Sequence, residues 1–361
     1  MIGHLKDKFK NNFLYKNKYK THLEAVVISC FFNPQKSSYR RKAFDIFYDS
    51  IKHLNHRIVE CVIGDDEPEL PLDNPNITRV HTKNLLWHKE SLLNGIVKNL
   101  PAHFKYIFWV DADVIFTNNH WLVEAVEELH DHTIVQPFEY CVHLDQDQLE
   151  PDFDVHSQRE YVDGPNRHKK MWRSFASNFA LNRPQIHSED YDVHGHVGFA
   201  WGARRSVLDN CPLYDKGLIG GGDHIIAHAC IDQIPHLCIT KSFTEDIDNV
   251  LEWSKKFHKV TRSRLGFVKG DLYHIWHGDL NKRNYYKRIL EFTPKSKNIV
   301  DKDENGLYVT DNQDATDYMT NYFIIREVTD VIDPTSHHHH GDDQHHKCDS
   351  DDNYYQEPNF S

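Results

Sequence analysis

The chain has 361 residues, of which 39% are hydrophobic and 27% are charged, and its formal net charge is −12. This composition is typical of globular proteins and excludes a fibrous or wholly disordered chain. The apolar runs all fall short of the roughly 18 residues that a membrane span needs. We therefore expect a protein without a transmembrane segment.

The negative charge is concentrated at the end of the chain. Residues 296–361 contain 15 acidic and 4 basic side chains, whereas residues 1–295 contain 39 acidic and 38 basic ones. A neutral body lacks the clustered lysines and arginines of a nucleic-acid surface, so we expect no nucleic-acid partner. The segment 1–20 holds six lysines, which could make weak contact with an anionic membrane surface.

Cysteine usage and the first residues predict a reducing compartment. The seven cysteines are scattered and none forms a CxxC pair, so their spacing indicates neither a zinc ribbon nor a disulfide framework. The segment 1–20 lacks the apolar stretch of about 7–15 residues that a signal peptide contains. We therefore predict a cytoplasmic protein.

Strands and helices alternate in the hydrophobic pattern, which predicts an α/β fold. Short, continuously apolar runs, typical of buried parallel strands, occur at residues 25–32, 57–63 and 106–110. Helical spacing of apolar residues predicts helices at 41–54, 85–100 and 121–129. This order predicts a mostly parallel sheet with helices on both faces, and ligands bind beyond the carboxyl ends of such strands.

Composition divides the chain into four segments. We expect a basic N-terminal arm (1–20), an α/β domain (21–295), a C-terminal appendage that retains enough apolar residues to pack (296–333) and a disordered His/Asp-rich tail (334–361). The tail contains His337–His340, His345 and His346, without a partner at a structural zinc spacing. These histidines could bind metal adventitiously. One alternative function, a histidine-rich metal-storage protein, depends on these tail histidines alone.

Two carboxylates follow the apolar run YIFWV. Asp111 and Asp113 leave a predicted buried strand, so both can project into one crevice at the end of the sheet. Like charges this close repel each other unless a cation lies between them, and oxygen ligands suit Mg²⁺ or Mn²⁺. The alternative is a solvated turn in which an aspartate caps the next helix.

Lys89 is the unusual residue of the predicted helix 85–100. The apolar residues of this helix define one face, and Lys89 falls near the centre of that face, where an unpaired charge is costly. Either the helix begins later and Lys89 extends to solvent, or its ammonium points toward an anion such as a phosphate-bearing ligand.

The segment 194–224 is rich in glycine and ends in the run GGGDH. Glycines of this kind allow the backbone to approach a ligand closely, but the segment lacks the ending of a phosphate-binding loop. Asp223 follows three glycines and precedes an apolar helix predicted at 224–231. It is either the N-cap of that helix or a catalytic base presented in a cleft.

His274 and His277 occur in the sequence YHIWHG. Two histidines at this spacing can bind one metal ion if the backbone is helical or turned. The apolar and aromatic neighbours favour a buried site, whereas many histidine pairs are surface features in a chain that holds 28 histidines.

Taken in chain order, these motifs resemble a glycosyltransferase of the GT-A fold. The strand-borne DxD, the stretch ending in GGGD and the HxxH before NKRNYYKR are most similar to the β-1,4-galactosyltransferase and polypeptide GalNAc-transferase catalytic type, over residues 25–288. That type has a WGGED-like turn where this chain reads GGGDH. The resemblance implies a Rossmann-like GT-A domain over 21–295 and, without a stem or anchor, a cytoplasmic enzyme of bacterial or viral type.

The resemblance also implies an activity and a cofactor. The enzyme would transfer a hexose or N-acetylhexosamine from a nucleotide sugar, expected to be UDP-linked, to a hydroxyl of a glycan or protein, with inversion favoured. Asp113, His277 and His274 would bind Mn²⁺ or Mg²⁺, and Asp111 would contact the nucleotide ribose or the metal. Asp223 would be the base that deprotonates the acceptor, or would bind the acceptor.

Four further residues match positions that contact the donor in such enzymes. Lys89 and Asn94 would touch the nucleotide or its diphosphate, and Trp201 and Gly202 would touch the donor sugar. The long polar segment 143–168 could close over the site and exclude water.

Two other functions remain open. A sugar-phosphate nucleotidyltransferase would use a similar sheet, but it needs a glycine-rich basic signature after the first strand, where this chain reads CFFNPQKSS. A catalytically silent carbohydrate-binding protein could share the fold. The DxD and HxxH motifs argue against it, because clustered carboxylates without a metal would only repel one another.

Overall fold

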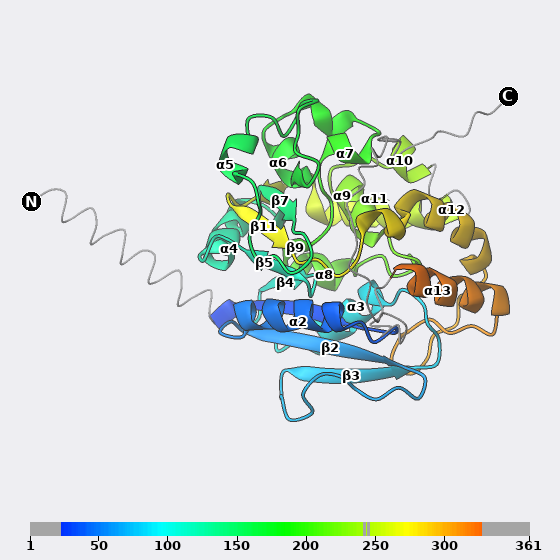
Figure 1. Ribbon diagram of the computed structural model, residues 1–361. Coiled ribbons are helices and arrows are strands. Elements are labelled where there is room, and N and C mark those ends of the chain that lie inside the picture. Colours follow the sequence, from blue (N-terminus) through cyan, green and yellow to red (C-terminus); the bar gives the residue numbers. More distant parts are fainter. Residues whose placement is uncertain (1–22, 241–242, 244–245, 327–361) are drawn as a thin grey trace, which may run out of the picture. The chain divides into compact units, whose positions relative to one another are not determined.

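Two sheets organise the residues that the computed structural model describes, which are 23–240, 243 and 246–326. Within these ranges, the larger sheet has seven strands in the order β10 (Leu265–Phe267), β6 (Ile134–Gln136), β9 (Ala200–Arg204), β4 (Tyr106–Val110), β1 (Ala25–Phe31), β2 (His56–Ile63) and β3 (Ile77–Thr82). Only β9 runs antiparallel to its neighbours, so this sheet is mostly parallel. Figure 1 shows β2 and β3 side by side at one edge of it.

A smaller sheet lies beyond the carboxyl end of β4. In the described part of the chain it has four strands, in the order β5 (Val114–Phe116), β11 (Asp271–His274), β7 (Tyr140–His143) and β8 (Met171–Arg173). Strand β11 pairs antiparallel with β5 and parallel with β7, so a segment from late in the chain lies between two earlier ones.

Helices cover both faces of the larger sheet, as the strand sequences predict. In β1, Val26 and Ile28 pack into one apolar cluster, whereas Ala25 and Val27 pack into another on the opposite face, as the two-residue period of a strand requires. The first cluster includes residues of α3 (Lys89–Asn99), α8 (Arg205–Asn210), α9 (Gly222–Cys230) and α11 (Ile247–Thr261). The second includes residues of α2 (Ser38–Ile51) and α4 (Trp121–Asp131). The predicted α/β class is therefore confirmed.

Short helices fill the segments between strands. They are α5 (Val155–Gln158), α6 (Phe175–Ala180), the 3-10 helix η1 (Pro184–His187), α7 (Tyr191–His194) and α10 (Leu237–Thr240). The predicted covering segment 143–168 contains α5, and its Val155 and Val162 pack against the smaller sheet. None of the helices in the described part of the chain has the length and apolar character that a membrane span requires.

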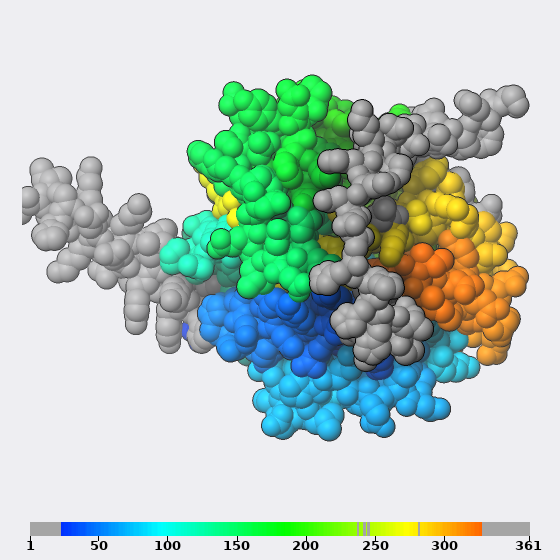
Figure 2. Space-filling view, viewed as in Figure 1, coloured from blue at the N-terminus to red at the C-terminus, as the bar shows by residue number. Residues whose placement is uncertain are grey.

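The C-terminal part consists of the 3-10 helix η3 (Leu280–Arg283), α12 (Tyr285–Ser296) and α13 (Gln313–Arg326). Phe292, Met319 and Phe323 are buried in one cluster that also contains residues preceding α3. Two hydrogen bonds join Asn84, which precedes α3, to the backbone of Thr310. Figure 2 shows the C-terminal part, in orange, beside the cyan part of the chain. The contacts cross the predicted boundary at residue 296, whereas the predicted arm 1–20 and tail 334–361 lie outside the described residues.

Candidate metal and carboxylate site

The pairing of β5 with β11 builds the centre of the site. Asp111 and Asp113 occupy the turn between β4 and β5, where the backbone N–H of Asp111 donates to the carbonyl of Phe199 at 2.7 Å. In the β5–β11 ladder His274 lies opposite Val114. The sheet register therefore brings His274 beside Asp113, although the two are far apart in the sequence.

The three predicted metal ligands lie together. Nε2 of His277 is 2.9 Å, and Nε2 of His274 is 3.6 Å, from Oδ2 of Asp113, and the potential ligand atoms of all three lie within 4.8 Å of one another. Adjacent ligands of an octahedral ion with bonds near 2.1 Å are about 3.0 Å apart. Within the described residues, the buried Oδ1 of Asp113 has no hydrogen-bond partner. This donor set fits a divalent cation such as Mn²⁺.

The protonation states also suit metal binding. Burial opposes ionisation of Asp113, but the imidazoles of His274 and His277 hold the pKa of this carboxyl well below its usual range. Burial lowers the pKa of His274, and burial together with Arg40 lowers the pKa of His277 to about 3. At neutral pH the cluster is therefore a carboxylate with two neutral imidazoles, the forms that bind metal ions.

Three residues that the sequence analysis did not assign surround this cluster. Nδ1 of His143 lies 3.1 Å from Nδ1 of His274 and orients that ring. The guanidinium Nη2 atoms of Arg283 and Arg40 lie 3.0 Å from Nε2 and 3.5 Å from Nδ1 of His277. The basic run NKRNYYKR was a signal for Arg283. Arg40 and His143 had no local signal, because their partners are distant in the sequence.

Lys89 connects the two remaining carboxylates. Helix α3 begins at Lys89, so this side chain leaves the first turn, and its Nζ lies 2.7 Å from Oδ1 of Asp111 and 2.8 Å from Oδ2 of Asp223. Two alternatives were open for Lys89, a later start of the helix or contact with an anion. The helix does begin later than predicted, at Lys89. The ammonium also contacts anions, and these are the carboxylates of Asp111 and Asp223. Burial raises the pKa of Asp111 to about 6, although Lys89 acts in the opposite direction.

The GGG run places Asp223 beside this ion pair. Gly220 and Gly221 have φ angles of 101° and 90°, which glycine adopts far more readily than other residues. A Cβ atom at Gly222 would lie 2.2 Å from Oε1 of Glu90, so the third glycine permits close packing on α3. The N-cap position of α9 is Gly221, and the Asp223 carboxylate, free of a capping role, binds Lys89.

Asn94 lies away from the cluster. Its side-chain amide donates to the carbonyl of Leu213 at 2.9 Å, and its carbonyl oxygen accepts from the Leu213 backbone N–H at 2.9 Å. Both ends of the amide are thus used to hold the segment after α8 against α3. The predicted contact of Asn94 with the nucleotide is corrected to this structural role.

Trp201 and Gly202 lie in the interior of the larger sheet. Trp201 is fully buried and its indole N–H donates to the carbonyl of Val197 at 2.8 Å. A Cβ atom at Gly202 would lie 2.2 Å from the ring of Phe108, so glycine is needed here for packing between adjacent strands. The predicted contacts of both residues with a donor sugar are therefore corrected, because neither side-chain position faces the site.

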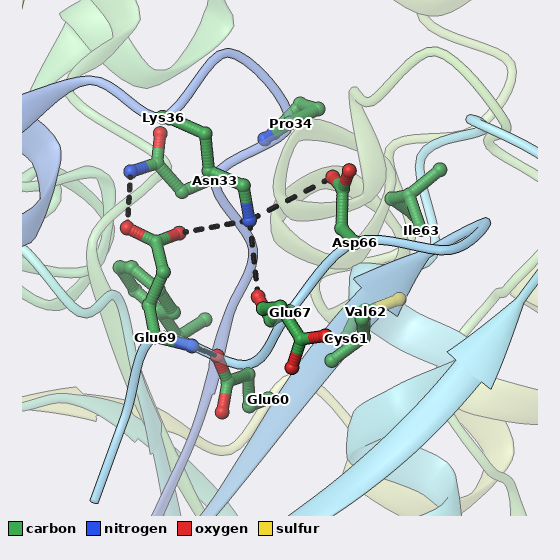
Figure 3. A pocket seen from close by; sticks show the side chains of 11 residues that line it. Asn33, Pro34, Lys36, Glu60, Cys61, Val62, Ile63, Asp66, Glu67 and Glu69 are labelled. Atoms are coloured by element: carbon green, nitrogen blue, oxygen red, sulfur yellow. Dashed lines mark hydrogen bonds and ion pairs between the residues drawn. The ribbon is translucent and has the colours of Figure 1, made fainter.

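A pocket opens at the carboxyl ends of β1 and β2, the same sheet edge that carries Asp111 (Figure 3). The ammonium of Lys36 lies within it, 3.6 Å from a carboxylate oxygen of Asp66, 3.6 Å from one of Glu69 and 3.3 Å from the carbonyl oxygen of Glu67. No local sequence pattern pointed to these residues. Their carboxylates make the pocket rich in hydrogen-bond acceptors.

No protein-family model matches the chain, and no curated protein matches it. Solved structures of glucosyl-3-phosphoglycerate synthase from Mycobacterium tuberculosis are similar to it. The complex with Mg²⁺ and uridine diphosphate has 12% identity and a TM-score of 0.40, covering 79% of this chain and 83% of that one. The complex with Mn²⁺, uridine diphosphate and phosphoglyceric acid has 14% identity and a TM-score of 0.41, covering 80% and 84%.

Proposed function

We propose that the chain is a metal-dependent glycosyltransferase of the GT-A type, which transfers a hexose or N-acetylhexosamine from a UDP-sugar to a hydroxyl of a glycan or protein. The observation that carries this proposal is the convergence of Asp113, His274 and His277 at the end of β4, with the carboxylates of Asp111 and Asp223 held beside it by one ammonium. The ordered DxD, GGGD and HxxH motifs support the same class of reaction.

Asp113, His274 and His277 would hold Mn²⁺ or Mg²⁺, which when bound stabilises the charge that develops on a diphosphate leaving group. Arg283 and Arg40 contact the histidine pair and would donate hydrogen bonds to phosphate oxygens, because guanidinium groups pair well with phosphate. Together these residues form a positively charged end of the site, suited to a nucleoside diphosphate.

Asp223 would accept the proton of the acceptor hydroxyl, and attack from its side of the sugar would invert the anomeric centre. The Lys89 ammonium lies 2.8 Å from Oδ2 of Asp223 and holds this carboxylate in place. The same ammonium fixes Asp111, which would contact the ribose or the metal. Lys89 is thus a positioning residue between donor and acceptor sides.

The acidic cluster around Lys36 would accept hydrogen bonds from the ribose of the donor. It lies at the same sheet edge as Asp111, since β1 is parallel to both β2 and β4. Acidic side chains at strand ends accept hydrogen bonds from ribose hydroxyls in other nucleotide-binding sheets, and Asp66, Glu67 and Glu69 offer such groups here. A bound nucleoside would displace part of the Lys36 ion-pair network.

The test is Mn²⁺-dependent hydrolysis of UDP-sugars by the purified full chain, with UDP-galactose, UDP-glucose and their N-acetylated forms assayed in parallel. We expect slow release of UDP from one of these donors. Asp113→Ala should reduce that release at least 100-fold, because an essential ligand of the metal is lost. Asp131→Ala, which removes an aspartate at the end of α4, is the matched control and should retain full activity.

If no donor is hydrolysed, calorimetry measures whether the protein binds UDP in the presence of Mn²⁺. Binding that disappears in Asp113→Ala, without turnover of any donor, would favour a silent carbohydrate-binding protein over an enzyme. Absence of both turnover and UDP binding would contradict the proposal, and the DxD carboxylates would then have a structural role only.

A further inference from the structure

A second group of side chains that could hold a metal ion includes His224, the residue after Asp223. His194 ends α7, His224 and His228 lie one helical turn apart on α9, and Cys238 belongs to α10. Their potential ligand atoms all lie within 4.8 Å of one another. Three elements therefore converge on one point through three imidazoles and a thiol.

The spacing of these atoms matches a tetrahedral metal site. Nε2 of His194 lies 3.3 Å from Nε2 of His224, and Sγ of Cys238 lies 3.2 Å and 3.3 Å from Nε2 of His224 and His228. Around a tetrahedral Zn²⁺ with its usual bond lengths, two nitrogens are about 3.3 Å apart, and a nitrogen and a sulfur about 3.6 Å. The side chains thus stand close to the positions that an ion would require.

The hydrogen bonds of the Nδ1 atoms of His194 and His228 show which nitrogen of each ring is directed at the other side chains of the cluster. Nδ1 of His194 lies 2.9 Å from the carbonyl oxygen of Gly195, and Nδ1 of His228 lies 3.0 Å from Oε1 of Gln233. Because both partners are acceptors, each Nδ1 carries the proton and each Nε2 presents a lone pair. This arrangement of an outer acceptor behind the ring is typical of metal-bound histidine.

Lone pairs that face one another in a buried site need a positive centre. His194 and His228 are fully buried, and His224 and Cys238 are partly buried. Because Nδ1 carries the proton in His194 and in His228, the Nε2 atom of each ring can only accept, from His224 and Cys238 respectively. A divalent ion bound by a thiolate and three neutral imidazoles would use all four ligand atoms at once.

We propose that His194, His224, His228 and Cys238 bind a structural Zn²⁺ that fastens the start of α9, and with it Asp223, to α7 and α10. Zinc suits the set because it prefers tetrahedral nitrogen and sulfur ligands. Four protein ligands leave no position for substrate, so the ion stabilises the fold and orients the chain. His224 directly follows Asp223, so the ion sets the position of that carboxylate through one peptide unit. The inference does not depend on the proposed glycosyl transfer.

The first measurement is the metal content of the full chain, purified without an affinity metal and dialysed against a weak chelator. We expect about one zinc per chain, and less than a tenth of this in Cys238→Ser. Three matched controls should keep the zinc. They are Cys230→Ser, at the end of the same helix, Cys348→Ser, next to the tail histidines, and Asp113→Ala, in the other cluster.

Cobalt replacement reports the ligands even if Cys238→Ser folds poorly. The wild-type chain loaded with Co²⁺ should show a thiolate-to-cobalt band and the intense visible bands of a tetrahedral ion. His228→Asn should weaken these bands, and zinc removal should lower the midpoint of thermal unfolding by several degrees. The proposal is overturned if wild-type protein retains no metal, if the cobalt spectrum lacks the thiolate band, or if Cys348→Ser removes the metal and Cys238→Ser does not.

Discussion

Glu90 is a buried acid whose environment makes the stability of the protein depend on pH. It lies next to Lys89 in the first turn of α3, is 2% exposed and packs against Gly222. Burial raises its pKa to about 8, although the Lys89 charge opposes this. The folded protein therefore keeps a proton on Glu90 at pH values where the unfolded chain, with an ordinary glutamate pKa, has released it.

The sign of the pH effect follows from this difference. Since the folded state binds the additional proton, stability from Glu90 is fully present below about pH 4.5 and falls as the pH rises toward about 8. We expect Glu90→Gln to remove this slope. The free energy of unfolding of the variant, relative to wild type, should rise by up to about 1.4 kcal/mol per pH unit across that window.

Denaturant unfolding at several pH values between 5 and 8.5 measures the effect. Glu304→Gln, which changes an exposed glutamate by the same atoms, is the control and should stay parallel to wild type. If Glu90→Gln also stays parallel, Glu90 is ionised in the folded protein and its neutral state is wrong.

The observed strands and helices show which elements could be predicted from the hydrophobic pattern of the sequence and which could not. Strand β4 (Tyr106–Val110) coincides with the predicted apolar run, because a buried parallel strand is apolar on both faces. Strand β3 (Ile77–Thr82) was not predicted. It is one of the two edge strands of the larger sheet, and several of its side chains are partly exposed, so its sequence has no continuous apolar run. Helix α2 begins at Ser38 because the Ser37 hydroxyl accepts from the backbone N–H of Arg40, which the apolar spacing alone did not show.

Two glycines in different elements predict opposite effects of the same substitution. Gly202→Ala places a methyl group 2.2 Å from the Phe108 ring in the sheet and should destabilise the protein by about 1–3 kcal/mol or more. Gly95 lies inside α3, where a Cβ atom meets nothing within 4 Å. Gly95→Ala should therefore stabilise the protein by about 0.5–1 kcal/mol.

Urea unfolding of both variants measures these changes. The pair serves as its own control, because the atoms added are identical and only their surroundings differ. A neutral Gly202→Ala would mean that the neighbouring ring can move aside, and would contradict the close strand packing.

At the scale of the molecule, the sequence singled out the residues of the site but did not show which of them contact one another. Asp111, Asp113, Asp223, His274 and His277 were all identified from short patterns that bring polar groups to the ends of apolar segments. Their mutual contacts depend on how β11 pairs with β5, which no local pattern contains. In the second cluster, His224 and His228 have the H-x3-H spacing of zinc ligands, which was overlooked, whereas His194 and Cys238 are separated from them in sequence and had no local signal.

The C-terminal helix α13 should unfold together with the rest of the described chain. Phe323 is 1% exposed, with its ring centre 5.6 Å from that of Phe32 and 6.3 Å from that of Trp87. Phe323→Ala should lower the free energy of unfolding by about 3–5 kcal/mol, whereas Ile325→Ala, at a 60% exposed position, should change it by less than about 0.5 kcal/mol. Thermal unfolding checks this: an unchanged main transition in Phe323→Ala would show that residues 296–333 form a separate appendage.

The pairing of β11 with β5 also sets an order of events during synthesis. His277 follows Asp113 by 164 residues, a delay on the order of ten seconds at ordinary rates of translation. Strand β4 and its carboxylates therefore leave the ribosome well before the strand that completes the smaller sheet. A chain that stops short of His277 carries the aspartates but cannot assemble the three-residue cluster. The complete three-residue cluster thus marks chains that have been extended past His277.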